Sequence, residues 1–299
     1  MSLRAIAVLL IAASTASLVH ADPVELKTFA ALAKPAPTAV LEYGPASSQA
    51  VDVFLPSGKG PHPVAILIHG GCWRDLPGAG REQLRPIASE LANHGIAVWS
   101  IGYRRADEKG GGYPGTFQDV ATAIDQLRLH TAPYNLDASR TVVVGHSAGG
   151  HLALWASVRD HLPTQSPLRS TNALVPGSVI TLGGVPDLKA FGRFVPLLCG
   201  PGIIEKLAPQ ATSIDPYADI SPAQLPPPPG LVVMVSGILD RLVPPYLADD
   251  YARLMRRTHS KAVTLVEIPG AGHFDLVTPG TSAWKEVESS ILAALRVGS

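Results

Sequence analysis

Residues 141–153 read TVVVGHSAGGHLA, and they carry the clearest indication of how the chain folds. The β-favouring run Thr141–Val144 leads directly into GHSAG at 145–149, and apolar residues at helical spacing follow. A serine between glycines, at the junction of a strand and a helix, is typical of a strained turn. Such a turn lifts the hydroxyl above a parallel sheet and sets it beside the free N–H groups of the helix. We therefore expect a strand, a sharp turn and a helix, with Ser147 as a candidate nucleophile rather than an incidental serine.

The sequence on either side of this turn predicts an α/β fold with a mostly parallel sheet. Short apolar runs alternate with amphipathic segments from Val51 onward, as buried strands alternate with the helices that cover both sheet faces. Helices are expected after Thr116, which forms a capping-box pattern with Asp119, and near the end of the chain. The expected strands are 51–55, 64–68, 96–101, 141–144, 178–182, 231–235 and 263–267.

One connection is much longer than a helical crossover needs. Residues 184–230 separate the strands near 178–183 and 231–236, so we interpret them as an insertion. Insertions at the carboxyl ends of parallel strands tend to form lids or pocket walls, and a purely structural excursion is the alternative. The side chains expected to line a substrate pocket are Phe191, Phe194 and Leu197 of the insertion and, on the opposite wall, Trp73.

Composition excludes several classes of function. With 299 residues, 46% hydrophobic and 16% charged, the chain suits one large-cored domain over 22–299 rather than a disordered protein. Lys plus Arg equals Asp plus Glu at 24 each, without a basic cluster, so nucleic-acid binding is not expected. The chain has no Cys-x-x-Cys or His-Glu-x-x-His motif. We therefore expect neither a metal nor a cofactor.

Residues 1–21 have the pattern of a signal peptide. Arg4 precedes the apolar run Ala5–Ala13, and Val19–Ala21 resembles a small-residue cleavage site. The run is shorter than the about 20 residues that a membrane-spanning helix needs. We expect cleavage near Ala21 and export to the periplasm or the medium, without stable membrane insertion. A buried N-terminal helix is the alternative.

Cys72 and Cys199 are the only cysteines of the chain. In an oxidising compartment an even pair of cysteines can form a disulfide. Such a bridge would join the loop after strand 64–68 to the insertion. Two separate buried thiols are the alternative, and the one that we favour from the sequence.

A glycine pair follows the expected strand 64–68, in the stretch HGGCW at 69–73. Acyl transfer places negative charge on an oxygen, and fixed N–H donors must stabilise that charge. Consecutive glycines let backbone N–H groups approach it without obstruction. We expect an oxyanion hole here, whereas His69 itself should hold the loop by hydrogen bonding. The expected donors are the N–H group of Ala148 and those of either Gly71 and Cys72 or Gly70 and Gly71.

A serine nucleophile needs a base, and the base needs an acid to orient it. His273 lies in a glycine-rich loop after the last expected strand, and Asp240 follows the strand before it. Asp249 and Asp250 compete for the acid role but lie on an expected helix, where solvated charges are normal. Asp275 follows the histidine too closely to orient it easily. We therefore assign Asp240 as the acid and His273 as the base.

Taken together, these motifs resemble those of the α/β-hydrolase superfamily. The resemblance rests on HGGCW at 69–73, YRR at 103–105, PGTFQD at 114–119 and GHSAGGHLA at 145–153. It covers about residues 51–295 and is strongest to the carboxylesterase and kynurenine-formamidase-like (arylformamidase-like) branch, near the hormone-sensitive-lipase type. The chain order serine, aspartate, histidine also matches. The resemblance implies the α/β-hydrolase fold and the roles of nucleophile, acid and base for Ser147, Asp240 and His273.

The function expected from these observations is hydrolysis of small acyl or aryl esters through an acyl-enzyme. An arylformamidase-type amidase is an alternative, although an exported chain would not meet a cytosolic tryptophan metabolite. A prolyl-oligopeptidase-like peptidase usually carries a large β-propeller, for which this chain has no room. A non-enzymatic binding module usually lacks one of the three catalytic residue types, and all three are present here. We expect a small-molecule ester as the partner, and no pattern specifies an oligomeric state.

Overall fold

A computed structural model describes residues 22–208, 215–259 and 261–297, so the expected signal peptide lies outside the described residues. One eight-stranded sheet has the order β1-β2-β4-β3-β5-β6-β7-β8. The first two strands, β1 (Ala39–Glu42) and β2 (Ala50–Phe54), run antiparallel to their neighbours, and the other strands pair in parallel. The parallel strands are β3 (His62–Ile68), β4 (Ala97–Ile101), β5 (Leu136–His146), β6 (Ser178–Leu182), β7 (Leu231–Gly237) and β8 (Thr264–Ile268).

The mostly parallel sheet is confirmed, and every expected strand forms within a few residues of its expected bounds. Two differences concern local extent. The strand before the serine begins at Leu136, earlier than its apolar run, and β1 was not expected. Both stretches are partly exposed, so they lack the continuous apolar run that marks a buried strand.

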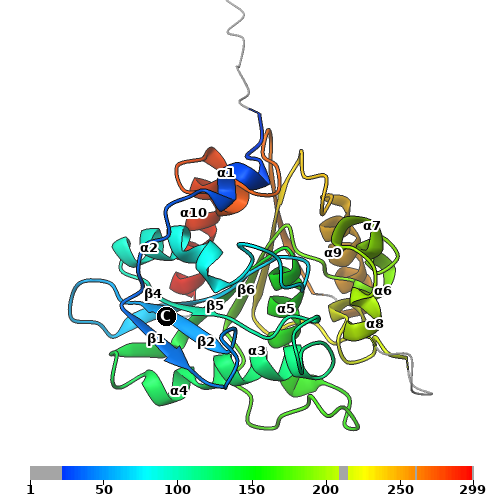
Figure 1. The fold of residues 1–299 in the computed structure, drawn as a ribbon, viewed down its shortest axis with the longest axis horizontal. Helices are drawn as coiled ribbons and strands as arrows, with labels where there is room; N and C mark the ends of the chain where they lie inside the picture. Colours follow the sequence, from blue (N-terminus) through cyan, green and yellow to red (C-terminus); the bar gives the residue numbers. More distant parts are fainter. Residues whose placement is uncertain (1–21, 209–214, 260, 298–299) are drawn as a thin grey trace, which may run out of the picture.

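Helices cover both faces of the sheet (Figure 1). Side chains alternate along each strand, so Ile66 and Ile68 of β3 belong to one core cluster and Leu67 to the other. The first cluster packs under α3 (Gly115–Asp125), α5 (Ala148–Ala156) and α9 (Tyr246–His259), and the second under α2 (Arg85–Asn93) and α10 (Ser282–Val297). The shorter helices are α1 (Leu26–Ala30), α4 (Leu127–His130), α6 (Leu188–Phe191), α7 (Val195–Cys199) and α8 (Ile203–Leu207), with 3-10 turns at Arg81–Leu84, Arg159–His161, Pro222–Gln224 and Asp275–Val277.

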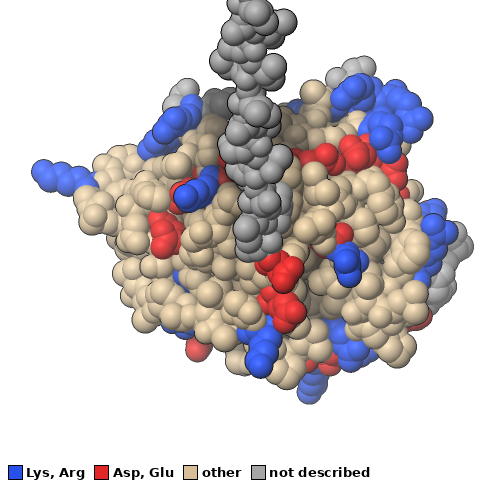
Figure 2. All heavy atoms as spheres, turned by 90° about the horizontal axis from the view of Figure 1, so that it is seen from above, with Lys and Arg blue, Asp and Glu red and all other residues tan. Residues whose placement is uncertain are grey.

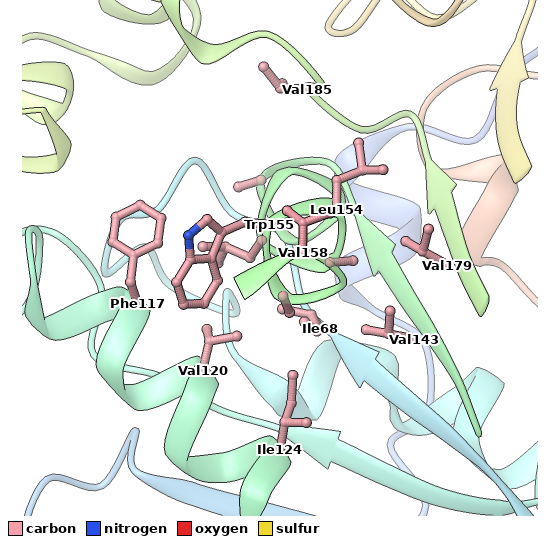
Figure 3. Packing of buried hydrophobic residues seen from close by; sticks show 14 of the residues in the cluster. Ile68, Phe117, Val120, Ile124, Val143, Leu154, Trp155, Val158, Val179 and Val185 are labelled. Atoms are coloured by element: carbon pink, nitrogen blue, oxygen red, sulfur yellow. The ribbon is translucent and has the colours of Figure 1, made fainter. Parts of the chain in front are cut away.

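The helix that follows Ser147 is held by aromatic packing (Figure 3). Phe117 of α3 meets Trp155 of α5 edge to face, with the ring centroids 5.1 Å apart. The Trp155 indole donates a hydrogen bond of 2.9 Å to the carbonyl of Asp219 in the insertion. Burying a large apolar side chain stabilises a fold by about 1.5–3 kcal/mol. This packing therefore anchors the carboxyl-terminal end of α5, the helix that begins directly after the serine.

The expected capping box at Thr116 and Asp119 is wrong. Helix α3 begins at Gly115, and the Asp119 carboxylate accepts two 2.8 Å bonds from the guanidinium of Arg104. The Thr116 hydroxyl donates to the carbonyl of Arg104. A charged, bidentate partner binds a carboxylate more strongly than a neutral N–H group does, so Arg104 replaces the cap.

The insertion is linked covalently to the loop that follows β3. Cys72 and Cys199 form a disulfide with Cα atoms 5.4 Å apart, so the favoured alternative of two separate thiols is wrong. In the same region, the Arg74 guanidinium donates to the Cys199 carbonyl at 3.0 Å. Helix α7 is therefore joined to this loop by one covalent bond and one hydrogen bond.

Candidate active site

Ser147 occupies a strained turn between β5 and α5. Its backbone has φ +54° and ψ −121°, a conformation that non-glycine residues rarely adopt. The backbone packs too closely here for a side chain at Gly149, whose added Cβ would lie 2.1 Å from the Ile68 carbonyl oxygen. The Ser147 N–H donates to the Leu182 carbonyl on β6 at 2.9 Å. The predicted sharp turn is therefore present, and the neighbouring strands hold it.

Asp240 and His273 are hydrogen-bonded to each other. Asp240 Oδ2 lies 2.6 Å from His273 Nδ1, and both residues are buried. A carboxylate only accepts, so Nδ1 carries the proton and Nε2 is left with a lone pair. The other oxygen of Asp240 accepts the N–H groups of Leu242 and Val243, each at 2.9 Å. These three bonds fix the carboxylate on the imidazole.

Asp275, the competing carboxylate, has a different role. Its Oδ2 accepts the Gly272 N–H at 2.9 Å and the Val24 N–H at 3.0 Å. Asp275 thus ties the loop that carries His273 to the start of the described chain. Asp275 therefore holds backbone N–H groups and does not orient the imidazole of His273.

The glycine-pair loop presents backbone N–H groups beside Ser147. Gly71, Cys72 and Trp73 have consecutive positive φ values of 105°, 57° and 52°. Within the described part of the chain, the N–H groups of Gly71, Cys72 and Ala148 have no hydrogen-bond acceptor. Gly71, Cys72 and Ala148 all line one cavity with Ser147. Gly70 is not among the residues that line it and packs closely against His146 and Ser147 instead.

Three buried histidines surround these groups. The Nδ1–H group of His69 donates to the Gly70 carbonyl at 2.7 Å, and the imidazole ring stacks on Tyr103. These contacts hold the loop, as we expected of His69. His151 accepts from the Trp73 indole at 3.2 Å and donates from Nε2 to the Ile220 carbonyl. Burial lowers the pKa of His69 to about 3 and that of His151 to about 4.

His146 links the serine turn to the base loop. Its Nε2–H group donates to the His273 carbonyl at 3.1 Å, and the two rings lie 4.5 Å apart. Burial, with a smaller contribution from His273, lowers the pKa of His146 well below its usual value. His69, His146 and His151 are therefore neutral, and each forms local hydrogen bonds.

The cavity above Ser147 has a volume of about 260 Å³ and is lined mainly by apolar side chains. Trp73 and Phe191 line it, as the sequence predicted. No Asp, Glu, Lys or Arg side chain is among its described lining residues, and His273 and Ser147 both face it. On the face of the molecule shown in Figure 2, acidic and basic side chains lie interspersed among uncharged ones.

Two expected pocket residues are not in this cavity. Leu197 is 84% exposed, and Phe194 packs against Phe191 with the guanidinium of Arg193 over its ring, 4.7 Å from the centroid. Leu198 lines the cavity instead. Successive helical residues point about 100° apart, so an error of one position on α7 exchanges a lining residue for an exposed one.

The N-terminal helix α1 also lines the cavity, and the sequence analysis missed it. Leu26, Phe29 and Ala30 face the cavity from this helix. The available signal was the apolar pair Leu26 and Phe29, whose spacing of three residues places both on one face of a helix.

Among the described residues, no cluster of His, Cys, Asp or Glu could hold a metal ion, and no helix is long and apolar enough to span a membrane.

Comparisons with known proteins agree with the fold. A family model described as BD-FAE matches residues 51–191. The esterase LipC of Mycobacterium tuberculosis is 31% identical over 252 residues, which are 79% of this chain and 59% of LipC. The probable carboxylic ester hydrolase LipM of the same organism is 27% identical over 75% of this chain and 52% of LipM. This chain therefore spans little more than half the length of these two relatives.

A kynurenine formamidase and two solved hydrolase structures are also similar to this chain. The kynurenine formamidase of Salmo salar is 23% identical over 79% of this chain and 74% of that enzyme. Among solved structures, Thermogutta terrifontis esterase 2 phosphoramylated by tabun superposes with a TM-score of 0.69 at 20% identity, over 89% of this chain and 96% of that one. An acetyl ester-xyloside bifunctional hydrolase from Caldicellulosiruptor lactoaceticus gives 0.68 at 17% identity, over 88% and 97%. The chain therefore has the α/β-hydrolase fold, and its sequence is similar to those of esterases and of a kynurenine formamidase.

Proposed function

We propose that this chain is a serine hydrolase that cleaves small, neutral acyl or aryl esters through an acyl-enzyme. The observation that carries the proposal is the 2.6 Å bond between Asp240 and His273, beside a cavity that His273 shares with Ser147. The names of the esterase relatives support the same reaction class.

In the proposed mechanism, Ser147 Oγ attacks the ester carbonyl and His273 Nε2 takes its proton. Asp240 holds the imidazole tautomer and stabilises the imidazolium that forms. The free N–H groups of Ala148 and of the loop at Gly71 and Cys72 bind the oxyanion, and one such donor contributes about 3–4 kcal/mol to lowering the barrier. The intermediate collapses and the alcohol leaves with the proton from His273. Water then repeats the same steps on the acyl-enzyme.

The lining of the cavity favours esters over N-formylkynurenine. That formamide carries an ammonium and a carboxylate, and no charged side chain among the described lining residues could pair with them. Burying a charge without a partner is strongly unfavourable. Cleaving an unactivated amide also requires an acid placed to protonate the leaving amine. An arylformamidase activity remains the second candidate because kynurenine formamidases are among the relatives.

One series of substrates tests the proposal. The values of kcat/KM should be measured for p-nitrophenyl esters from acetate to palmitate, beside N-formylkynurenine. The cavity of about 260 Å³ favours a maximum between acetate and butyrate. A maximum at laurate or longer would contradict the small-ester proposal. If N-formylkynurenine exceeds every ester, the chain is a formamidase. Labelling by a fluorophosphonate in wild type, absent in Ser147→Ala, separates either hydrolase from a binding module.

We also propose that the chain is exported. The disulfide between Cys72 and Cys199 supports this proposal because disulfides persist in oxidising compartments. Mass spectrometry of the protein secreted or released from the periplasm should find an N-terminus directly after Ala21. Full-length protein in the cytoplasm with free thiols would contradict export.

A further inference from the structure

Residues 23–30, which we call the N-terminal arm, dock on the loop that carries the proposed base. One oxygen of Asp275 accepts the N–H of Val24 in the arm at 3.0 Å and the N–H of Gly272 in the loop at 2.9 Å. The packing leaves no space between them, because a Cβ added to Gly272 would lie 2.7 Å from the Cβ of Pro23. A single carboxylate thus holds the arm and the His273 loop together.

Phe29 connects the arm to both sides of the reacting centre. Its ring stacks on Phe274 at 5.3 Å and lies 6.3 Å from the ring of His146. Phe274 follows the proposed base in the chain, and His146 precedes the proposed nucleophile. Phe29 is only 4% exposed, so these contacts are buried. The arm is therefore packed into the site rather than laid over it.

Leu26 extends this arm into the cavity. It lines the cavity with Phe29 and Ala30 although it is 61% exposed, which places it towards solvent. In Figure 1, α1 lies beside the orange segment that follows β8, and Phe274 of that segment lines the same cavity. The arm thus forms one wall of the cavity, and the side chains of Leu26 and Phe29 occupy space that a substrate chain would otherwise fill.

We propose that the N-terminal arm determines substrate specificity, with Leu26 and Phe29 limiting the length of the apolar group and Asp275 as the positioning residue of that wall. The inference rests on the proposed ester hydrolysis. It predicts that shortening Leu26 lets longer esters bind, whereas enlarging it rejects all but the shortest. Asp275 should act on chain-length preference through the arm and not on the chemical step directly.

The kinetic test compares chain-length preference among variants. In Leu26→Ala, the ratio of kcat/KM for octanoate to that for acetate should rise about three- to tenfold, because one methylene in a pocket changes affinity by about that much or more. Leu26→Trp should lower the same ratio. Leu129→Ala is the matched control, since Leu129 is 68% exposed on α4 and does not line the cavity. An unchanged ratio in both Leu26 variants would overturn the proposal.

Variants of Asp275 provide a second test. Asp275→Ala removes both hydrogen bonds and should shift the ratio as Leu26→Ala does, mainly through KM. Asp275→Asn keeps an accepting oxygen and should restore the wild-type ratio. A fall in kcat with an unchanged ratio in Asp275→Ala would show a merely structural role. The Leu26 variants still decide the proposal if Asp275→Ala does not fold.

A binding experiment separates this inference from the proposed function. Alkyl phenyl ketones of increasing chain length can be titrated into the Ser147→Ala protein by calorimetry, with and without Leu26→Ala. The arm predicts that Leu26→Ala shifts the tightest-binding ketone to a longer chain. If wild type cleaves no ester, the proposed function fails, yet the ketone series still tests the wall. An unshifted series overturns the wall whatever the enzyme cleaves.

Discussion

The carboxyl edge of the sheet and the walls of the cavity above it are held in place in different ways. Ser147, Asp240 and His273 follow β5, β7 and β8, whose positions depend on a continuous parallel ladder and two buried cores. The walls come from segments outside the ladder. One wall is held by the carboxylate of Asp275, and the other by the disulfide at Cys199. Many small contacts fix the edge, whereas a few identifiable bonds fix each wall.

This difference implies that substitutions at the edge and substitutions in the walls should have separate effects. A change at the edge should remove the chemistry and leave the fold intact. A change in a wall link should alter stability or substrate preference and leave residual chemistry.

The largest effect is expected at the edge. Ser147→Ala and His273→Ala should each lower kcat by about 10⁴-fold or more, because the three groups act as a unit. Asp240→Asn should lower kcat by about 10⁴-fold because an amide favours the wrong imidazole tautomer. Steady-state kinetics on p-nitrophenyl acetate measures the loss, and circular dichroism checks the fold. Near-wild-type kcat in Asp240→Asn would assign the acid role to another carboxylate.

Breaking the covalent wall link should chiefly affect stability. The disulfide closes a separation of 127 residues, so its loss in the Cys72→Ser, Cys199→Ser double variant should lower the free energy of unfolding by about 5 kcal/mol in the chain-entropy model. Urea titration followed by tryptophan emission measures this change. Dithiothreitol should destabilise wild type and leave the double variant unaffected. Equal urea midpoints for the two proteins would mean that the bridge does not hold the wall.

Acid should lower the free energy of unfolding through two buried histidines beside the site, His69 and His151. His69 and His151 have pKa values lowered to about 3 and about 4, so the unfolded chain binds more protons than the native one below about pH 6.5. Their contribution to stability is complete above that pH and is lost as the pH falls from about 6.5 towards 4. At pH 5 each costs about 2 kcal/mol of unfolding free energy.

Urea unfolding at pH 7.5 and pH 5 measures the acid effect. The loss should be smaller in His69→Asn, which cannot take up a proton, than in wild type. His259→Gln is the control, since His259 is exposed at the end of α9. Equal losses in His69→Asn and wild type would show that His69 does not contribute to the acid sensitivity.

The smallest effects distinguish two neighbouring leucines of α7. Leu197→Ala should change stability by less than about 0.5 kcal/mol and leave kcat/KM unchanged, because Leu197 faces solvent. Leu198→Ala should raise KM about threefold or more, because Leu198 lines the cavity. Parallel kinetics on butyrate esters compares the two variants directly. A larger KM effect for Leu197 would reverse the assignment of this wall.

The same division explains what the sequence could predict. The strands, the turn at Ser147 and the order of Asp240 and His273 are marked by local patterns: apolar runs, turn glycines and positions after strands. The tertiary structure keeps these patterns because each one agrees with the buried sheet. The residues at the carboxyl edge of the sheet could therefore be predicted almost one by one.

The walls were less predictable because their contacts are long-range. Nothing near Val24 marks its bond to Asp275, which lies 251 residues away. The one-residue error between Leu197 and Leu198 arose because α7 is a single short turn, with no periodic stripe to fix its face. The capping box failed for a similar reason, since the guanidinium that displaced it, Arg104, comes from another segment.

The hydrogen bond between Trp73 and His151 has a spectroscopic consequence. Trp73 lines the cavity and donates its indole N–H to His151, whereas Trp99, Trp155 and Trp284 are not among the described residues that line it. Indole emission responds to the polarity around the ring, so the part of the intrinsic fluorescence that changes when a ligand fills the cavity comes from Trp73. Trp73→Phe should remove that change without removing the ligand. The intrinsic fluorescence of Trp73 can therefore be used to measure ligand binding in the cavity.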